Sequence, residues 1–421
     1  MAKRVIAVLA FAHLMLGTLS AQGNDVSPYS LYGYGDRRYN AHAIVSAMGG
    51  VGANFFDGTA INTVNPASYV HLRQTTYEVG IHTDIAQFKT HLSSDSRSAT
   101  YISQVDLALP LKRSAFLLGF LPFSATGYNG RESDPKSADA FVAHDADGEL
   151  NAFVMGYAYQ ITQDFSLGIH VNYVFGNKTN DVISGQGDAQ LLTDQRETSH
   201  TKGFYFTGGA IYTKGLKDGK NVNIGATYSL GAQFQTEYDR LVYTFRYAGD
   251  GTGRQTTLDT ISPEKGAKGT LDLPFRAALA LGLSRDRKFG YGAQADFENF
   301  QNFKIDGKRQ PDFKNSVRLA AGGYWIPKYS DTRNYFSRVT YRFGTFYEGT
   351  YLHLNGKRIR DGGVSFGLGL PMGIERASTL NLGLILGRRG TVANRLVREN
   401  YMNLRLCLSF GERWFRKRKY D

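Results

Sequence analysis

The stretch LGIHVNYVFG, residues 167–176, alternates between two kinds of side chain. Its odd-numbered positions carry Leu, Ile, Val, Tyr and Phe, and its even-numbered positions carry Gly, His, Asn, Val and Gly. The stretch VNIGATYSLG, residues 222–231, repeats the pattern. Because successive side chains of a strand point to opposite faces, each stretch predicts a β-strand with one apolar face and one small or polar face.

The same alternation recurs in about fourteen segments between residues 75 and 411. We expect strands near 75–90, 98–111, 114–128, 150–161, 165–178, 201–214, 220–237, 272–284, 289–302, 313–325, 337–348, 361–370, 377–388 and 399–411. Long loops are expected at 129–149, 179–200 and 238–271, the last with an extended hairpin near 238–248. The sequence therefore predicts an all-β fold, a closed transmembrane antiparallel barrel over residues 75–411. Its apolar face would meet lipid, and its short turns would lie opposite the long external loops.

Residues 1–21 have the features of a secretory signal peptide: Lys3 and Arg4, an apolar stretch over 5–16, and small residues before Gln22. This apolar stretch is too short to span a bilayer as a helix, and no other segment is long enough. The mean hydropathy of −0.33 suits a barrel in which every second residue is polar or small. Export combined with amphipathic strands predicts the bacterial outer membrane.

The formal net charge is +12, but the basic residues do not form one stripe. Many lie in turns, and a group from Arg413 to Lys419 lies in a tail at 412–421. This distribution favours contact with outer-membrane lipid phosphates over a nucleic-acid partner. With Cys407 as the only cysteine, no internal disulfide is possible.

The parity of the predicted strands places seven charged residues on the inward face. They are Asp106, Arg276, Asp296, Glu298, Arg318, Arg342 and Arg405. On the lipid face each charge would cost about 2–4 kcal/mol near the midplane. The inward charges could form a polar substrate path or an ion-pair network that fills the lumen or holds a plug. We favour the network, because a wide lumen must fill its polar space.

Residues 22–74 are not strand-like. They contain a small-residue run with Gly49, Gly50 and Gly52, then Asp57, then the pair Asn65-Pro66. Small residues allow tight backbone packing, and Asn before Pro favours a fixed turn. We therefore expect this segment to plug the lumen.

The run AMGGVGA at 47–53, then Asp57, then Asn65-Pro66-Ala67 resembles the N-terminal hatch of the FadL family. These are outer-membrane transporters of long-chain fatty acids and aromatic hydrocarbons. The resemblance implies a hatch at 22–74 inside the barrel and passive uptake of hydrophobic small molecules. The chain departs from the family in its ending, 411–421, which resembles that of Bacteroidetes members. Some FadL-like barrels in that group serve protein secretion, so secretion or surface display, with secretion-system proteins as partners, is the alternative.

For uptake, we expect the long loops to capture ligand and the barrel wall to release it partly sideways. Apolar residues in or near these loops are candidates for an entry groove: Phe141, Val142, Leu191, Leu192 and Tyr243. The sequence has no zinc-helix motif, Walker loop or nucleophile elbow. His170 faces the lumen without a Ser and an acid at defined positions, so an outer-membrane lipid hydrolase is the least favoured alternative. No metal or cofactor is expected.

Overall fold

The computed structural model describes residues 27–38, 42–133, 140–186, 191–247, 255–373 and 378–412. The predicted signal peptide, the first residues of the predicted plug and the basic tail from residue 413 lie outside the described residues. Among the described residues, no helix is both long enough and apolar enough to cross a bilayer.

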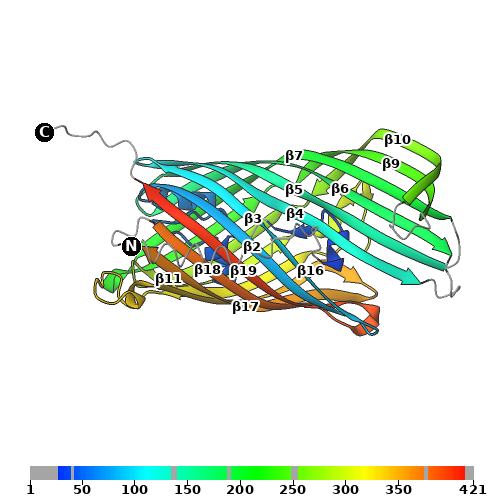
Figure 1. Ribbon diagram of the computed structural model, residues 1–421. Coiled ribbons are helices and arrows are strands. Elements are labelled where there is room, and N and C mark those ends of the chain that lie inside the picture. The colour runs from blue at the N-terminus through cyan, green and yellow to red at the C-terminus, as the bar shows by residue number, and fades with distance from the viewer. Residues whose placement is uncertain are drawn as a thin grey trace.

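Antiparallel strands form the wall of a closed barrel (Figure 1). The strands are β2 (Thr75–Lys89), β3 (Ser94–Pro110), β4 (Ser114–Ser133), β5 (Ala140–Gln160), β6 (Phe165–Gln186), β7 (Leu192–Gly215), β8 (Lys220–Ser229), β9 (Ala232–Tyr247), β10 (Gln255–Leu273), β11 (Arg276–Arg285), β12 (Phe289–Glu298), β15 (Ser316–Trp325), β16 (Thr340–Leu354), β17 (Lys357–Met372), β18 (Ser378–Gly390) and β19 (Arg398–Glu412). β8 continues into β9 and β10 into β11, so the described wall counts 14 strands, and β19 pairs with β2 to close it. The predicted all-β barrel is confirmed.

The two faces of the strands follow the predicted parity. On β6, Leu167 and Ile169 are 41% and 46% exposed on the outside, whereas His170 and Asn172 are buried. Other exposed apolar side chains continue this surface around the barrel, among them Val79, Ile102, Phe153, Phe204, Leu281, Leu319, Phe343, Phe366 and Phe410. Apolar side chains are more stable in contact with lipid than with water, so this outer surface suits a bilayer.

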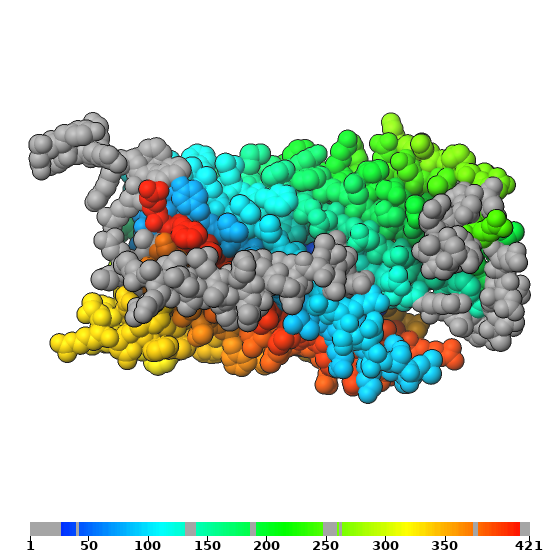
Figure 2. Space-filling model, in the orientation of Figure 1, coloured from blue at the N-terminus to red at the C-terminus, as the bar shows by residue number. Residues whose placement is uncertain are grey.

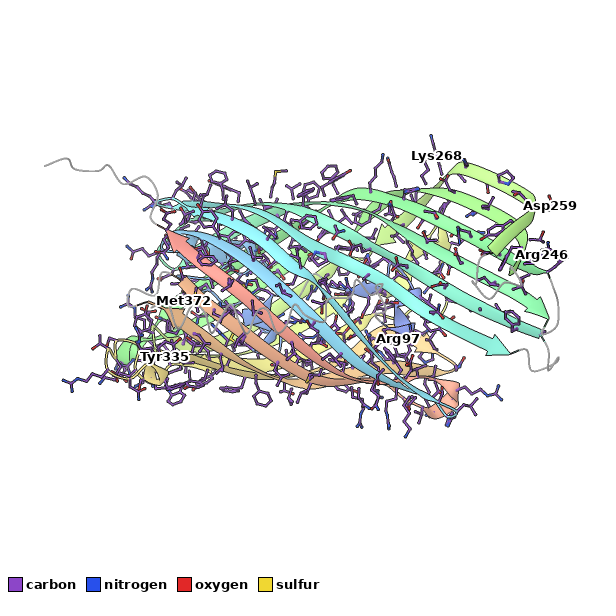
Figure 3. The ribbon with its side chains drawn as sticks, in the orientation of Figure 1. Arg97, Arg246, Asp259, Lys268, Tyr335 and Met372 are labelled. Atoms are coloured by element: carbon purple, nitrogen blue, oxygen red, sulfur yellow. The ribbon has the colours of Figure 1, made fainter. Side chains whose placement is uncertain are left out.

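The predicted loops at 129–149, 179–200 and 238–271 are wrong, except for the extended hairpin expected near 238–248, which is present in the pairing of β9 with β10. Strand pairing continues through them, so β4 to β7 and β9 with β10 extend as long hairpins, which form one end of the elongated molecule (Figures 1 and 2). Arg246, Asp259 and Lys268 lie at this end, while Tyr335 and Met372 lie at the other (Figure 3). Parts of the extensions, such as 177–181 and 193–200, are polar on both faces, so their sequence lacks the apolar alternation that marks a strand in lipid.

The N-terminal segment, residues 27–38 and 42–74, runs through the barrel interior. It contains η1 (Pro28–Leu31), β1 (Asp36–Arg37), α2 (Ala43–Ser46) and η2 (Pro66–His71). α2 contacts β17, β18 and β19, whereas η2 contacts β3 to β7 on the other side of the barrel. Ala53 and Tyr69 are fully buried. The segment therefore crosses the lumen and packs against both sides.

Glycines on the inner wall allow this close packing. A Cβ at Gly225 of β8 would lie 1.9 Å from the carbonyl oxygen of Ala53, and a Cβ at Gly344 of β16 would lie 2.2 Å from the nitrogen of Gly49. Real Cβ atoms do not approach other atoms this closely, so only glycine lets the backbone of the segment lie against these strands.

A second buried group comes from the connection between β12 and β15. It contains η4 (Phe300–Asn302), β13 (Lys304–Ile305) and β14 (Lys308–Arg309). Three other short 3₁₀ helices lie in connections elsewhere: η3 (Lys217–Gly219), η5 (Phe336–Arg338) and η6 (Ala393–Arg395). Phe300 and Phe303 are almost completely buried and pack with Tyr34 and Tyr351. Aromatic side chains thus fill part of the interior.

Candidate functional site

The glycine run of the N-terminal segment binds the wall through its backbone. Gly49 and Gly50 have φ of +69° and +87°, which only glycine adopts cheaply. The N–H of Gly49 donates to Ser365 Oγ at 2.8 Å, and the N–H groups of Gly52 and Ala53 both donate to Gln294 Oε1 at 2.9 Å. The predicted hatch glycines therefore lie in the lumen, attached to β17 and β12.

The Asn65-Pro66 pair starts η2 and anchors it. Asn65 Oδ1 accepts the N–H of Ala67 at 3.0 Å, which caps the turn, and Asn65 Nδ2 donates to the carbonyl oxygen of Ala210 at 3.1 Å. Pro66 occupies the first position of η2, where its missing N–H is not needed. Asp57 has a separate role: its Oδ1 accepts the N–H and the hydroxyl of Thr59, both at 2.8 Å.

Four of the predicted lumen charges form one ion-pair network. Arg276 lies 2.9 Å from Asp296 and 3.4 Å from Glu298, and Arg318 lies 3.6 Å from Asp296. Arg37 of the N-terminal segment joins the network, with one nitrogen 2.7 Å from Glu298 and another paired with Glu348. Sequence reasoning missed Arg37, because it lies outside any alternating segment.

The other three predicted lumen charges lie elsewhere. Arg342 is buried and donates to Asn381 Oδ1 at 3.1 Å. Asp106 is buried and accepts from Gln104 Nε2 at 3.1 Å. Arg405 lines a charged cavity of about 210 Å³ between the N-terminal segment and the wall.

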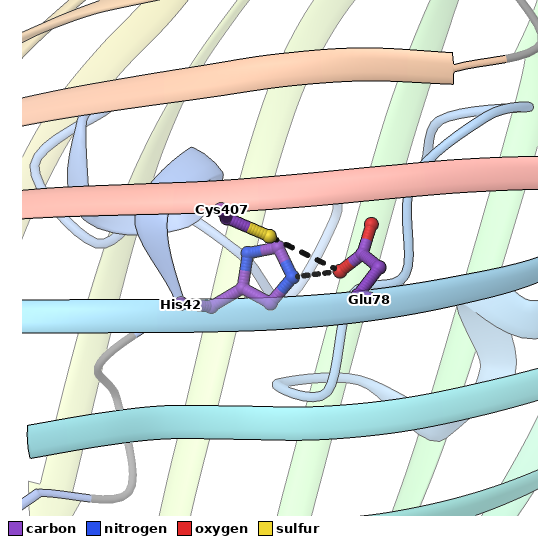
Figure 4. Close-up of side chains that lie close together, drawn as sticks. All are labelled: His42, Glu78 and Cys407. Atoms are coloured by element: carbon purple, nitrogen blue, oxygen red, sulfur yellow. Dashed lines mark hydrogen bonds and ion pairs between the residues drawn. The ribbon is translucent and has the colours of Figure 1, made fainter. Parts of the chain in front are cut away.

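Glu78 of β2 connects the segment to the closing seam of the barrel. One oxygen accepts from His42 Nε2 at 2.8 Å, and the other accepts from the N–H of Ile61 at 3.0 Å and the hydroxyl of Ser409 at 2.6 Å. Gln104 Nε2 also donates to it at 3.1 Å, and so does Cys407 Sγ at 3.8 Å; Figure 4 shows His42 and Cys407 beside Glu78. Glu78 holds an inward position of its strand, so parity could have identified it.

His42, Glu78 and Cys407 have side chains of the types that bind metals, and their ligand atoms lie within 4.8 Å of one another. However, His42 Nδ1 accepts the N–H of Ile44 at 3.3 Å, so the ring proton is on Nε2 and points at Glu78. A metal on Nε2 would force that proton onto Nδ1, against the N–H of Ile44. The cluster therefore fits a hydrogen-bonded anchor better than a metal centre.

The barrel wall is incomplete between β3 and β4. β3 pairs with β2 from Ser94 to Ala108, but with β4 only over Val105–Pro110 (Figure 1). A β-bulge between Pro122 and Ser124 marks the point where β4 turns away. We call this opening the β3–β4 seam.

The N-terminal segment occupies the edge of β4 in place of β3. Asp36 pairs with Ala125, Arg37 pairs with Ser124, and the N–H of Arg38 donates to the carbonyl oxygen of Phe123 at 2.9 Å. At the outer end of the seam, Arg97 Nη2 of β3 donates to the carbonyl oxygen of Asn129 at 3.0 Å (Figure 3). Across the seam, the N-terminal segment is attached to β4 by a two-residue β-pairing and by single hydrogen bonds, among them Ser124 Oγ to the carbonyl oxygen of Tyr34 at 2.7 Å. In the described residues, the other neighbouring strands of the wall are joined by ladders.

A cavity of about 390 Å³ lies beside the segment at the barrel end with the short turns. Asp57, Phe56, His71, Arg73 and Tyr324 contribute to its mixed lining. The His71 ring stacks on Phe56 with centroids 4.0 Å apart, and burial lowers the pKa of His71 to about 4. His71 is thus neutral at physiological pH.

The residues predicted to form an entry groove lie on the extended hairpins. Phe141, Leu192 and Tyr243 pack together with Phe245, while Leu191 is 54% exposed. Val142 lies half-buried beside Phe141 on β5. The structure thus brings three of the five together, but as a small packed cluster. His170 pairs with Tyr69 of η2 instead of with a Ser and an acid.

Solved structures of outer-membrane transporters share this fold, and three of them illustrate the similarity. The toluene transporter TbuX of Ralstonia pickettii has a TM-score of 0.60 and 14% identity, covering 88% of this chain and 97% of that chain. The toluene transporter TodX of Pseudomonas putida has a TM-score of 0.57 and 16% identity, covering 87% and 96%. A FadL homologue from Pseudomonas aeruginosa has a TM-score of 0.56 and 15% identity, covering 87% and 97%. The fold predicted from the resemblance to the FadL family is confirmed.

Comparison with curated proteins finds no match. A family model described as BamG matches residues 1–421.

Proposed function

The chain belongs to the BamG family, and from this premise and its barrel fold we propose that it conducts hydrophobic small molecules passively across the bacterial outer membrane. Long-chain fatty acids and aromatic hydrocarbons are the classes of ligand. The hairpins of β4 to β7 and of β9 and β10 capture the ligand outside, the N-terminal segment plugs the lumen, and the β3–β4 seam releases the ligand sideways.

The seam is the observation that supports this proposal. An apolar solute gains nothing by entering water, so a path that ends in the bilayer suits it better than a path that ends in the periplasm. The interior also argues for a sideways path, since the lumen beyond the segment is lined by paired charges such as Arg276, Asp296 and Glu298. Arg37 attaches the segment to those charges and to the edge of β4 at once.

A reversible lock across the seam tests the proposal. Asp36 and Ala125 are directly paired, so cysteines at these positions have the spacing of a disulfide. In a deletion strain that produces D36C/A125C, we expect uptake of labelled oleate or toluene to fall to background when oxidised and to recover on reduction. Comparison of the two redox states removes any effect of the substitutions themselves.

The matched control is F366C/L384C. Phe366 of β17 and Leu384 of β18 are also directly paired, but they lie away from the seam. Its oxidation should leave uptake unchanged. Equal uptake by the oxidised and reduced forms of D36C/A125C would show that the seam does not open during transport.

One observation favours a second function, a barrel that serves protein secretion or surface display. Phe300, Phe303 and Tyr351 fill part of the interior, and the 210 Å³ cavity is charged, which suits a static scaffold. A deletion strain that takes up oleate normally but loses surface proteins would favour this function. The solved structures above are transporters, so catalysis is not part of either proposal.

A further inference from the structure

One buried cation at the β3–β4 seam has no hydrogen-bond partner. The side chain of Arg38 is 3% exposed, and its Nε, Nη1 and Nη2 make no hydrogen bond. Its guanidinium carbon lies 3.8 Å from the centre of the Tyr101 ring. Nη1 lies 4.0 Å from Glu149 Oε2, which is beyond hydrogen-bond distance. A guanidinium has five N–H donors, and here all five are unmet.

The neighbours of Arg38 hold it in place but leave its side-chain donors without a hydrogen bond. Its backbone N–H is bound to Phe123 of β4 at 2.9 Å, which holds the residue in the seam. The Tyr101 hydroxyl bonds to His82 Nδ1 at 2.9 Å, and His82 Nε2 bonds to Asp84 at 2.7 Å. The Tyr101 ring is therefore held as a platform under the guanidinium, with its own polar atom already engaged.

A buried guanidinium with unmet donors is costly, and the group that best relieves it is an oxyanion, which can accept two parallel hydrogen bonds. The outer faces of the strands beside the seam are apolar: Ile102 and Val105 of β3 and Leu118 of β4 are 56%, 44% and 54% exposed. A ligand with an anionic head and an apolar tail matches both features.

We propose that Arg38 binds the oxyanion head group of an amphiphile whose tail lies in the β3–β4 seam. This inference rests on the proposed function and gives it a head-group site. Glu149, whose side chain is 45% exposed, adds a negative charge 4.0 Å from Arg38. That charge repels a dianionic phosphate more strongly than a carboxylate, so a carboxylate is the favoured head group.

The test measures binding by the full-length protein in a non-ionic detergent, using calorimetry. The probes are dodecanoate, dodecyl phosphate and the neutral dodecanol. We expect Arg38→Gln to weaken dodecanoate binding about tenfold or more, and to leave dodecanol binding unchanged, because only the charged head uses the guanidinium. Arg38→Lys should retain part of the affinity. The control is Arg287→Gln, on the exposed turn between β11 and β12, which should bind all three probes as the natural protein does.

Each outcome has one meaning. A loss confined to dodecanoate supports a carboxylate site, and a loss confined to dodecyl phosphate supports an oxyanion site used by lipid phosphate. Unchanged binding of both anions by a folded Arg38→Gln protein, as judged by heat-modifiable gel migration, overturns the inference. Toluene has no head group, so failure of toluene uptake would count against the proposed function while leaving the Arg38 site to be decided by the binding assay.

Discussion

At the scale of the residue, Glu78 decides how firmly the N-terminal segment is attached to the closing seam. Five groups donate to it: His42, Ile61, Gln104, Cys407 and Ser409. Glu78→Gln keeps the shape but turns one acceptor into a donor, and each orphaned buried donor costs about 1–3 kcal/mol. We expect a lower temperature for conversion of the folded to the unfolded band on gels. Glu264→Gln, on the exposed part of β10, is the control, because exposed ion pairs contribute about 0–1 kcal/mol. Equal conversion temperatures for the two variants would contradict this role.

At the scale of the element, the contact between β16 and the glycine run determines whether the segment stays in the lumen. Gly344→Leu puts a side chain where Gly49 now lies, because even a Cβ would come within 2.2 Å of its nitrogen. The barrel should still assemble, since no strand pairing is lost, but the segment should be displaced. Chymotrypsin should then cut at Phe55 or Phe56, which the natural fold protects; mass spectrometry identifies the cut. Gly362→Leu on β17, where a Cβ meets no atom closer than 3.4 Å, should remain resistant. Protection of both variants would mean that the segment does not depend on this contact.

At the scale of the whole molecule, the N-terminal segment should control permeation. Removal of residues 28–60 deletes no wall strand, so we expect an assembled barrel with an open polar lumen and a higher conductance in planar bilayers. Arg276 and Arg318 keep Asp296 as a partner after the deletion, while Glu298 and Glu348 lose Arg37. The pore should therefore show no strong preference for anions. Identical conductance of the deleted and intact proteins would show that the segment does not plug the barrel.

The sequence alone determined the barrel, its parity and many of the wall charges that face its lumen. In lipid, every backbone group must pair within the protein and every second side chain must be apolar, so stretches such as 167–176 allow one fold and one orientation. The same rule placed Asp296 and Arg318 inside. The turn at Asn65-Pro66 also followed from local turn chemistry, whereas its anchoring bond to Ala210 of β7 is a tertiary contact.

Only the tertiary structure showed which parts of the chain do not follow the alternation of apolar and polar residues. Outside the bilayer, strands can be polar on both faces, so most of the hairpin extensions, which fall within 129–149, 179–200 and 238–271, were expected as loops. Arg37, Arg38 and their partners are far apart in sequence and lie in a segment with no period, so nothing local predicts that they replace β3 along the edge of β4. The opening in the wall arises because β3 and β4 pair over only part of their length. Strand pairing depends on packing across the whole barrel and not on any one stretch of residues.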